Sequence, residues 1–310
     1  MNVVYGEIES HQTSCAHSAG PLDGNPEALA DTRPAPRGIT GLLGSAVAGM
    51  GTLGERLTST GGQQAVAAAQ GGVATLMSAV KGRVTDLTHA FGNDFPVIEP
   101  YVLKPEINHM ATLSVQGFNA NKLTIDEHTG THLDGPAHLD DGQMFTDQIP
   151  IERLVAPLRV IRVHAQAAAN PDYTLTLDDI HQHEKDHGRI PLGAFVVMDS
   201  GWAVRVPQAG AYLNRDATGT PHFPGLSAES VSMLVNDRGV FGAGVDTSSL
   251  DCGVHIPNPQ AHLHLLGNAR YGVENITNLA TVPDCGAIVV VGLLRHHPGY
   301  AGPVRLIAIH

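Results

Sequence analysis

The sequence feature that most restricts the possible folds is a series of short segments that are either apolar throughout or alternate between apolar and polar residues. The series begins at residue 83 and continues to the end of the chain. Each has five to seven residues, which is the length of a β-strand rather than of a helix. A hairpin connection is expected at residues 117–121, between the second and third of them. Strands are therefore predicted at residues 83–88, 109–115, 122–127, 158–164, 194–198, 240–245, 287–293 and 304–309.

Helices are expected in only a few of the intervening segments. Residues 228–237 follow Ser227, a good N-cap residue, and precede Gly239, which can end a helix. Further helices are predicted at Leu177–His187 and, more briefly, at Gln260–Leu266. Many short strands with few helices predict the α/β class, as a compact mixed β/α/β domain over residues 83–310.

The first 82 residues differ in composition from the rest of the chain. Residues 1–38 are polar and rich in Pro, Gly and Asp, which is typical of a poorly ordered tail. Residues 39–81 are rich in Gly and Ala, with helical patterns at 63–70 and 73–80. Because large aromatic residues are nearly absent, the first 82 residues cannot build a hydrophobic core of their own. We predict residues 1–82 to be a partly disordered, partly helical N-terminal extension of the main domain.

Charge and cysteine usage exclude several classes of protein. The formal net charge is −12 and no run of Lys and Arg occurs, which argues against a nucleic-acid partner and an anionic membrane surface. The three cysteines are far apart and form no CxxC pair, so neither a disulfide framework nor a thiolate zinc site is expected. A weak export-like pattern at residues 39–48 follows a long acidic segment, which is unlike a signal peptide. We therefore predict a cytoplasmic location.

Residues 128–138 carry the strongest chemical signal. Three histidines and one aspartate fall within these eleven residues, among glycines, threonines and a proline. His128 and His132 have the spacing of ligands on one helix face, but two glycines and the proline oppose a helix. On an extended backbone, His132 and Asp134 point the same way. Imidazole nitrogen with carboxylate oxygen suits Zn²⁺ or Mn²⁺, and the carboxylate could bridge two ions. The alternative to a metal site is an ordinary solvent-exposed loop that is rich in histidine.

Two other histidine groups are weaker. His183 and His187 match the HExxH zincin pattern, but their helix is charged nearly all round, which favours an ordinary surface helix. His262 and His264 lie beside leucines, and a histidine in such a helix is more often a satisfied core residue than a ligand.

The segment 128–138 resembles the signature of the cyclase-like metal hydrolases. That family includes bacterial kynurenine formamidase, isatin hydrolase and a dienelactone hydrolase. The resemblance covers residues 84–308, and residues 1–82 lie outside it. It continues in residues 86–91 with Pro96, in 200–202, 223–227 and 244–251, and around His262 and Glu274.

The resemblance implies a fold and a set of roles. The implied fold is a compact β/α/β domain, forming a homodimer or higher homo-oligomer. His128, His132 and Asp134 are implied to hold one divalent ion. Asp134, His262 and Glu274 are implied to complete a second, with Glu274 as a further shared ligand. His262 is chosen over His264 by its spacing of twelve residues from Glu274. His138 occupies the family's catalytic position.

The sequence departs from the family at positions that bear on the substrate. Ile98 stands where the kynurenine formamidases carry a tryptophan that stacks on an aromatic substrate, which argues against N-formylkynurenine. The family's Thr-Gly-Trp is here Ser200-Gly-Trp202. Glu274 favours two ions over the single ion of the isatin hydrolases. Phe223 is expected either to line the substrate or to belong to a tight turn before the helix of residues 228–237.

The leading hypothesis is therefore hydrolysis of a small-molecule amide, linear or cyclic, by water that one or two Zn²⁺ or Mn²⁺ ions activate. His138 would take the proton of that water and return it to the leaving group. A lactone or ester hydrolase with the same site is the first alternative. A metal-binding protein without catalysis, or an assembly module, is the second. The expected partner is a small-molecule substrate, with no nucleic acid and no membrane.

Overall fold

A computed structural model describes residues 81–208 and 210–310. The tail and the helical patterns predicted before residue 81 lie outside this range. None of the described helices has the length and apolar character that crossing a bilayer requires.

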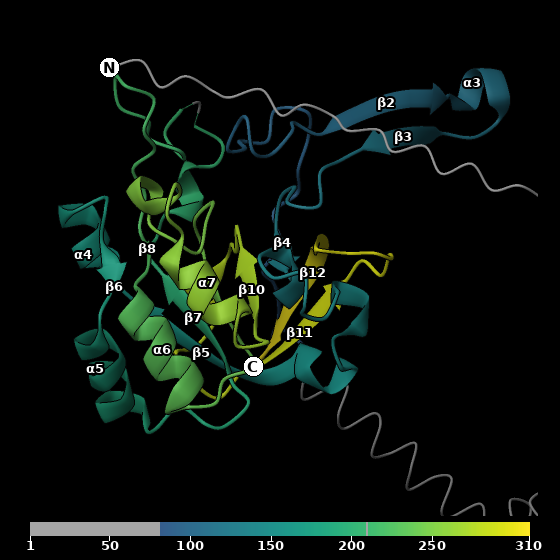
Figure 1. The fold of residues 1–310 in the computed structure, drawn as a ribbon. Helices are drawn as coiled ribbons and strands as arrows, with labels where there is room; N and C mark the ends of the chain where they lie inside the picture. The colour runs from purple at the N-terminus through teal and green to yellow at the C-terminus, as the bar shows by residue number, and fades with distance from the viewer. Residues whose placement is uncertain (1–80, 209) are drawn as a thin grey trace, which may run out of the picture. The chain divides into compact units, whose positions relative to one another are not determined.

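The described part is built around an eight-stranded mixed sheet that closes on itself (Figure 1). The strand order is β1-β12-β11-β5-β7-β9-β10-β4, and β12 also pairs with β4. Within it, β5, β7, β9 and β10 run parallel, whereas the other pairs are antiparallel. The bounds are β1 (Val84–Asp86), β4 (His132–Asp134), β5 (Val155–Arg162), β7 (Phe195–Asp199), β9 (Gly242–Val245), β10 (Tyr271–Glu274), β11 (Ile288–Leu293) and β12 (Ala301–Ile309).

Four helices lie in the connections between the parallel strands β5, β7, β9 and β10. The helix predicted at Leu177–His187 is α5, which begins with a capping box between Thr176 and Asp179. The predicted cap of α6 is also present, since the Ser227 hydroxyl accepts a hydrogen bond from the Ser230 N–H at 3.0 Å. In Figure 1, α5 and α6 lie on the same side of the parallel strands. The helices are α4 (His164–Ala169), α5, α6 (Ala228–Asn236) and α7 (Gln260–Leu266), with a short ladder of β6 (Thr174–Leu175) and β8 (Gly225–Leu226).

Strand β7 shows how the sheet divides the core into two layers. All five of its residues are buried. Phe195 and Val197 pack into the cluster inside the closed sheet, whereas Val196 and Met198 pack into the cluster beneath the helices. Side chains alternate along a strand, so a strand covered on both faces is apolar throughout. The α/β class predicted from the sequence is confirmed. The closure of the sheet was not predicted.

A hairpin projects from the sheet at the upper right of Figure 1. It consists of β2 (Glu106–Ala111), the short helix α3 (Leu113–Gln116) and β3 (Ala120–Thr124). The strand predicted for residues 109–115 is wrong at its end, because the Gln116 side chain accepts a hydrogen bond from the Thr112 N–H at 2.8 Å and closes a helical turn. Gly117 ends that turn at a φ of 79°.

Other differences lie in short or terminal segments. Strand β10 was not predicted, because four residues that include Gly272 show no alternation. Strand β4 was expected only as extended backbone, and pairing with β10 and β12 makes it a strand. His164, predicted at the end of a strand, is instead the first residue of α4.

Candidate metal centre

Three of the predicted ligands lie on two paired strands. In the antiparallel pair of β4 and β10, Glu274 is directly opposite His132. Leu133 and Val273 point into the core of the closed sheet. By alternation, His132, Asp134 and Glu274 therefore share the other face. The nearest distance between His132 Nε2 and Glu274 Oε2 is 3.4 Å.

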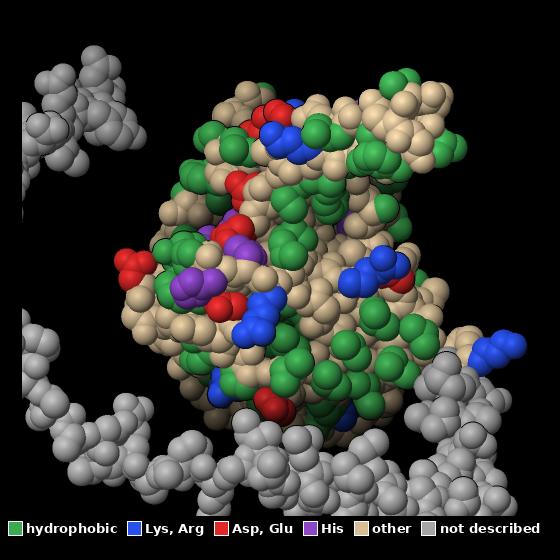
Figure 2. All heavy atoms as spheres, turned by 90° about the vertical axis from the view of Figure 1, so that its right-hand side faces the viewer, with side chains coloured by type: hydrophobic (Ala, Val, Ile, Leu, Met, Phe, Trp, Pro, Cys, Tyr) green, Lys and Arg blue, Asp and Glu red, His purple; other side chains and the backbone are tan. Residues whose placement is uncertain are grey.

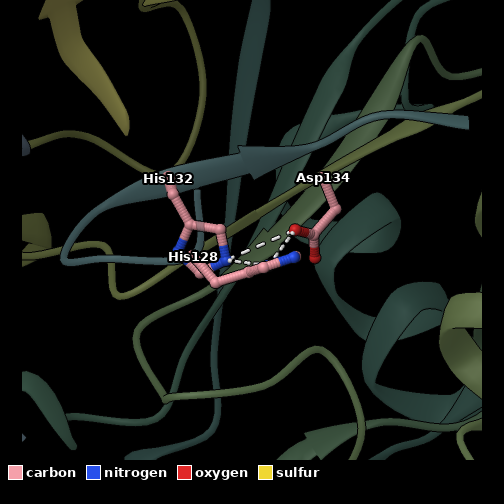
Figure 3. A group of neighbouring side chains, drawn as sticks. All are labelled: His128, His132 and Asp134. Carbon is pink, nitrogen blue, oxygen red and sulfur yellow. Dashed lines mark hydrogen bonds and ion pairs between the residues drawn. The ribbon is translucent and has the colours of Figure 1, made fainter. Parts of the chain in front are cut away.

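His128 reaches the same point from the loop before β4. Gly130 allows that loop to turn back, with a φ of +67°, and an added Cβ would lie 3.0 Å from the Phe91 ring. His128 Nδ1 lies 3.1 Å from His132 Nε2 and 2.9 Å from Asp134 Oδ1. Figure 3 shows the three side chains converging. The predicted convergence of the segment 128–138 is thus present in the fold.

Helix α7 brings the remaining predicted ligand. His262 is buried, and its Nε2 lies 3.0 Å from Glu274 Oε1 and 3.4 Å from Asp134 Oδ2. Asp134 therefore has one oxygen facing His128 and His132 and the other facing His262. Among the described residues, two groups have donor atoms close enough to share an ion, and they are His128–His132–Asp134 and Asp134–His262–Glu274.

The donor set fits divalent metal ions. Separations near 3 Å are those expected of atoms that surround an ion at about 2 Å. Both Asp134 oxygens are buried and have no hydrogen-bond partner among the described residues, although three imidazole nitrogens lie within 2.9 to 3.4 Å. A buried carboxylate in such a position is costly unless a cation compensates it, and that cation is either a protonated imidazole or a bound metal ion.

The charges of the cluster lead to the same conclusion. Burial alone would lower the pKa of His132, but Asp134 and Glu274 outweigh it and raise the pKa to about 10. Burial would raise the pKa of Asp134, but His128 and His132 hold it well below its usual range. Contacts with carboxylates likewise raise the pKa of His262, so without metal His132 and His262 retain their protons. The same negative charge would favour a divalent cation, whose binding displaces those protons.

His138 lies beside the ligands but belongs to neither group. It ends the 3₁₀ turn Pro136–His138, and its ring centroid is 4.4 Å from that of His128 and 6.3 Å from that of His262. Burial is the largest influence on the His138 pKa and lowers it. The imidazole is therefore neutral at pH 7 and can accept a proton.

Residues that the sequence did not single out support the ligands. His132 Nδ1 donates to the Gly130 carbonyl at 2.9 Å, and Asn275 Nδ2 donates to the same oxygen at 2.9 Å. His262 Nδ1 donates to Asp251 Oδ2 at 2.6 Å. Asp251 ends the family-like segment 244–251, but nothing in its spacing relates it to α7. Only the fold reveals this contact.

The cluster opens into a cavity of about 400 Å³. Ile98 is among the residues that line it. Phe223 does not, because it is completely buried in a core cluster with Ile98, Trp202 and Tyr212. Of its two expected roles, the structure does not place Phe223 where a substrate in this cavity would touch it, and the residue lies just before β8, in the segment that leads to α6. The wall is mainly apolar, with Ser248, Ser249 and Asn275 as its polar members beyond the ligands and His138.

The HExxH pair lies elsewhere. His183 is buried on α5, with its ring centroid 4.9 Å from that of His187. Neither residue belongs to the two groups of described residues that could share an ion.

Comparison with known proteins connects this site to a family. The family model described as a cyclase matches residues 85–252. Isatin hydrolase from Roseibium aggregatum is 33% identical over 242 residues, covering 73% of this chain and 91% of that protein. Kynurenine formamidase from Salinibacter ruber is 38% identical over 190 residues, covering 61% and 79%. A crystal structure of an isatin hydrolase bound to the product analogue thioisatinate superposes with a TM-score of 0.72 at 32% identity, covering 78% of this chain and 98% of that one.

Fold, site and similarity together define an enzyme of the hydrolase class. The family model spans more than half of the chain, and the isatin hydrolase relative spans nearly three quarters of it. The chain belongs to the cyclase family.

Proposed function

We propose that this protein is a metal-dependent amidohydrolase that opens a small, uncharged cyclic amide. The observation that carries the proposal is the pair of donor groups sharing Asp134 at the end of an apolar cavity. His128, His132 and Asp134 would hold one ion, Zn²⁺ or Mn²⁺, and Asp134, His262 and Glu274 a second. A bound divalent ion would act as a Lewis acid, polarising a carbonyl oxygen and lowering the pKa of water.

His138 is assigned the proton transfers. Its imidazole is neutral at pH 7, faces the cavity and is not needed as a ligand. It would accept a proton as water adds to the substrate carbonyl, and then donate that proton to the leaving nitrogen. The proton consumed in the second step is thus the one gained in the first.

The cavity wall supports an uncharged substrate. None of the described residues that line it is Lys or Arg, so away from the ion site a charged group of the substrate would find no counter-charge on the wall. Pro96, Val97, Ile98 and Val102 form an aliphatic side, which suits a compact apolar body. A relative is named isatin hydrolase, and isatin is an uncharged cyclic amide of this kind. N-formylkynurenine carries an amino-acid group that this wall does not match.

The test is a hydrolysis screen with the purified, metal-free chain reloaded with Zn²⁺ or Mn²⁺. Isatin, N-formylkynurenine and a small lactone are compared by kcat/KM. We expect isatin to exceed N-formylkynurenine by at least about tenfold, because burying an unpaired charge is costly. A preference for the lactone would favour the esterase alternative. No turnover of isatin with either ion would contradict the proposed opening of a small cyclic amide.

We also propose a homodimer or higher homo-oligomer in the cytoplasm. A two-stranded hairpin is marginally stable by itself, and β2 and β3 pair only with each other among the described strands. Its Met110, Leu113, Val115 and Phe118 are each more than half exposed. Hydrophobic side chains gather on the side from which the hairpin projects (Figure 2). Covering such a surface is a common reason for association, and light scattering would measure the assembly.

The free thiols of Cys252 and Cys285 agree with a reducing compartment.

A further inference from the structure

Asp251 is a buried carboxylate that directly contacts one predicted ligand. It is 2% exposed and lies at the end of the segment after β9, where it forms an isolated bridge with Leu226. Its Oδ1 accepts a hydrogen bond from the Ala261 N–H at 2.8 Å. Its Oδ2 accepts from the His262 N–H at 3.1 Å and from His262 Nδ1 at 2.6 Å. One side chain therefore holds both the first turn of α7 and the ring that α7 carries.

The contact determines which ring nitrogen of His262 is free. A neutral imidazole has one N–H, and the other nitrogen carries a lone pair. A carboxylate at Nδ1 places the proton there. The lone pair is then on Nε2, the atom that faces Glu274 Oε1 and Asp134 Oδ2. A carboxylate partner also increases the basicity of the imidazole as a ligand.

The other two imidazoles are supported differently. His132 Nδ1 donates to the backbone carbonyl of Gly130, which is a neutral acceptor. For His128, none of the residues in 81–208 and 210–310 makes a hydrogen bond to Nε2. Of the three imidazoles, His262 is thus the one whose ring nitrogen facing away from the ion site contacts a carboxylate, that of Asp251.

We propose that Asp251 is a positioning residue that holds His262 as its Nδ1–H tautomer and thereby sets the divalent-ion affinity of the Asp134–His262–Glu274 group. This inference rests on the metal site of the proposed function. It adds that the two ion-binding groups are held by different contacts. Loss of Asp251 therefore weakens ion binding to the Asp134–His262–Glu274 group and leaves ion binding to the His128–His132–Asp134 group unchanged.

The experiment titrates the metal-free full chain with Mn²⁺, following binding by calorimetry and electron paramagnetic resonance. The binding event that needs His262 is identified as the one lost in His262→Asn. In Asp251→Asn, which preserves side-chain volume, this event should weaken by roughly 10- to 100-fold. The event that remains in His262→Asn should keep its affinity.

A matched control is available in a second Asp–His pair. Asp172 accepts from His222 Nδ1 at 2.9 Å, and neither residue belongs to the two metal-compatible groups of described residues. Asp172→Asn should leave both Mn²⁺ affinities unchanged. Equal weakening in both variants would overturn the proposal, as would unchanged Mn²⁺ affinity in Asp251→Asn or no binding event lost in His262→Asn. Failure of the unaltered chain to bind any ion would instead refute the proposed function.

A measurement on the unaltered protein does not depend on how Asp251→Asn folds. In the Zn²⁺-loaded, ¹⁵N-labelled chain, the ring signals of His262 are assigned by their absence in His262→Asn. We expect a proton on Nδ1 and none on Nε2. A proton on Nε2, with Nδ1 free of hydrogen, would show that Asp251 does not set the tautomer.

Discussion

Replacement of His138 tests the division of labour between metal binding and proton transfer. The structure places His138 beside the ligands, within 4.4 Å of the His128 ring centroid, but outside both donor groups. We therefore expect His138→Ala to retain its divalent ions and lose turnover. Because the ring also packs against His128, His138→Gln provides a variant that fills more of the space without carrying the proton.

The magnitude follows from the role. A positioned general acid–base contributes about 10²–10⁴ to the rate, or about 3–5 kcal/mol of transition-state stabilisation. Both variants should lose kcat by this factor, because the lost group moves the proton whatever fills its place. KM should change much less, since the apolar wall that holds the substrate is intact.

The assay measures kcat with the best substrate of the screen, together with metal content by mass spectrometry on the same samples. Added imidazole should restore part of the activity of His138→Ala, where space is open, and less of that of His138→Gln. Activity within threefold of the unaltered enzyme, at full metal content, would refute the role of His138. Lost activity accompanied by lost metal would show that His138 supports the ligands instead.

Three further predictions concern the ligands and the fold. Asp134→Ala should lose both ions, since Asp134 is common to both groups, and two ions retained by mass spectrometry would contradict the shared role. Burial and the nearby His187 lower the pKa of His183 to about 4. As the pH falls, the unfolded chain therefore takes up a proton at this residue near pH 6.5, before the folded chain does. The free energy of unfolding consequently decreases between pH 6.5 and 4. Allowing for solvent screening, His183→Leu should reduce the stability lost between pH 7 and 5 by about 1–2 kcal/mol in urea unfolding, and an unchanged pH dependence would disprove this. In Gly225→Ala the new Cβ would collide with the Asp251–Cys252 backbone, so unfolding free energy should fall by about 3 kcal/mol or more, against about 1–2 kcal/mol for Gly286→Ala, where φ is +90° and the space is open. Equal losses in these two glycine variants would count against the collision.

Much of the fold could be read from local pattern. The strands β5, β7, β9 and β11 and the helices α5, α6 and α7 were predicted close to their observed positions, because buried apolar runs and capping residues are local signals. Strands β4 and β10 were not, since three or four residues become a strand only through their neighbours. The end of β2 was also missed, because the Gln116 side chain closes a turn that the apolar pattern does not reveal.

The sequence alone predicted the first half of the candidate site. His128, His132 and Asp134 fall within one short segment whose glycines and proline oppose a helix, and the family resemblance implied that the three hold one ion. Tertiary structure decided the rest. His262 and Glu274 meet Asp134 only because β10 pairs with β4 and α7 packs against β10. Asp251 meets His262, and Phe223 turns into the core, for the same physical reason: which side chains touch across a sheet or helix depends on the pairing of distant segments, and residue spacing does not encode it.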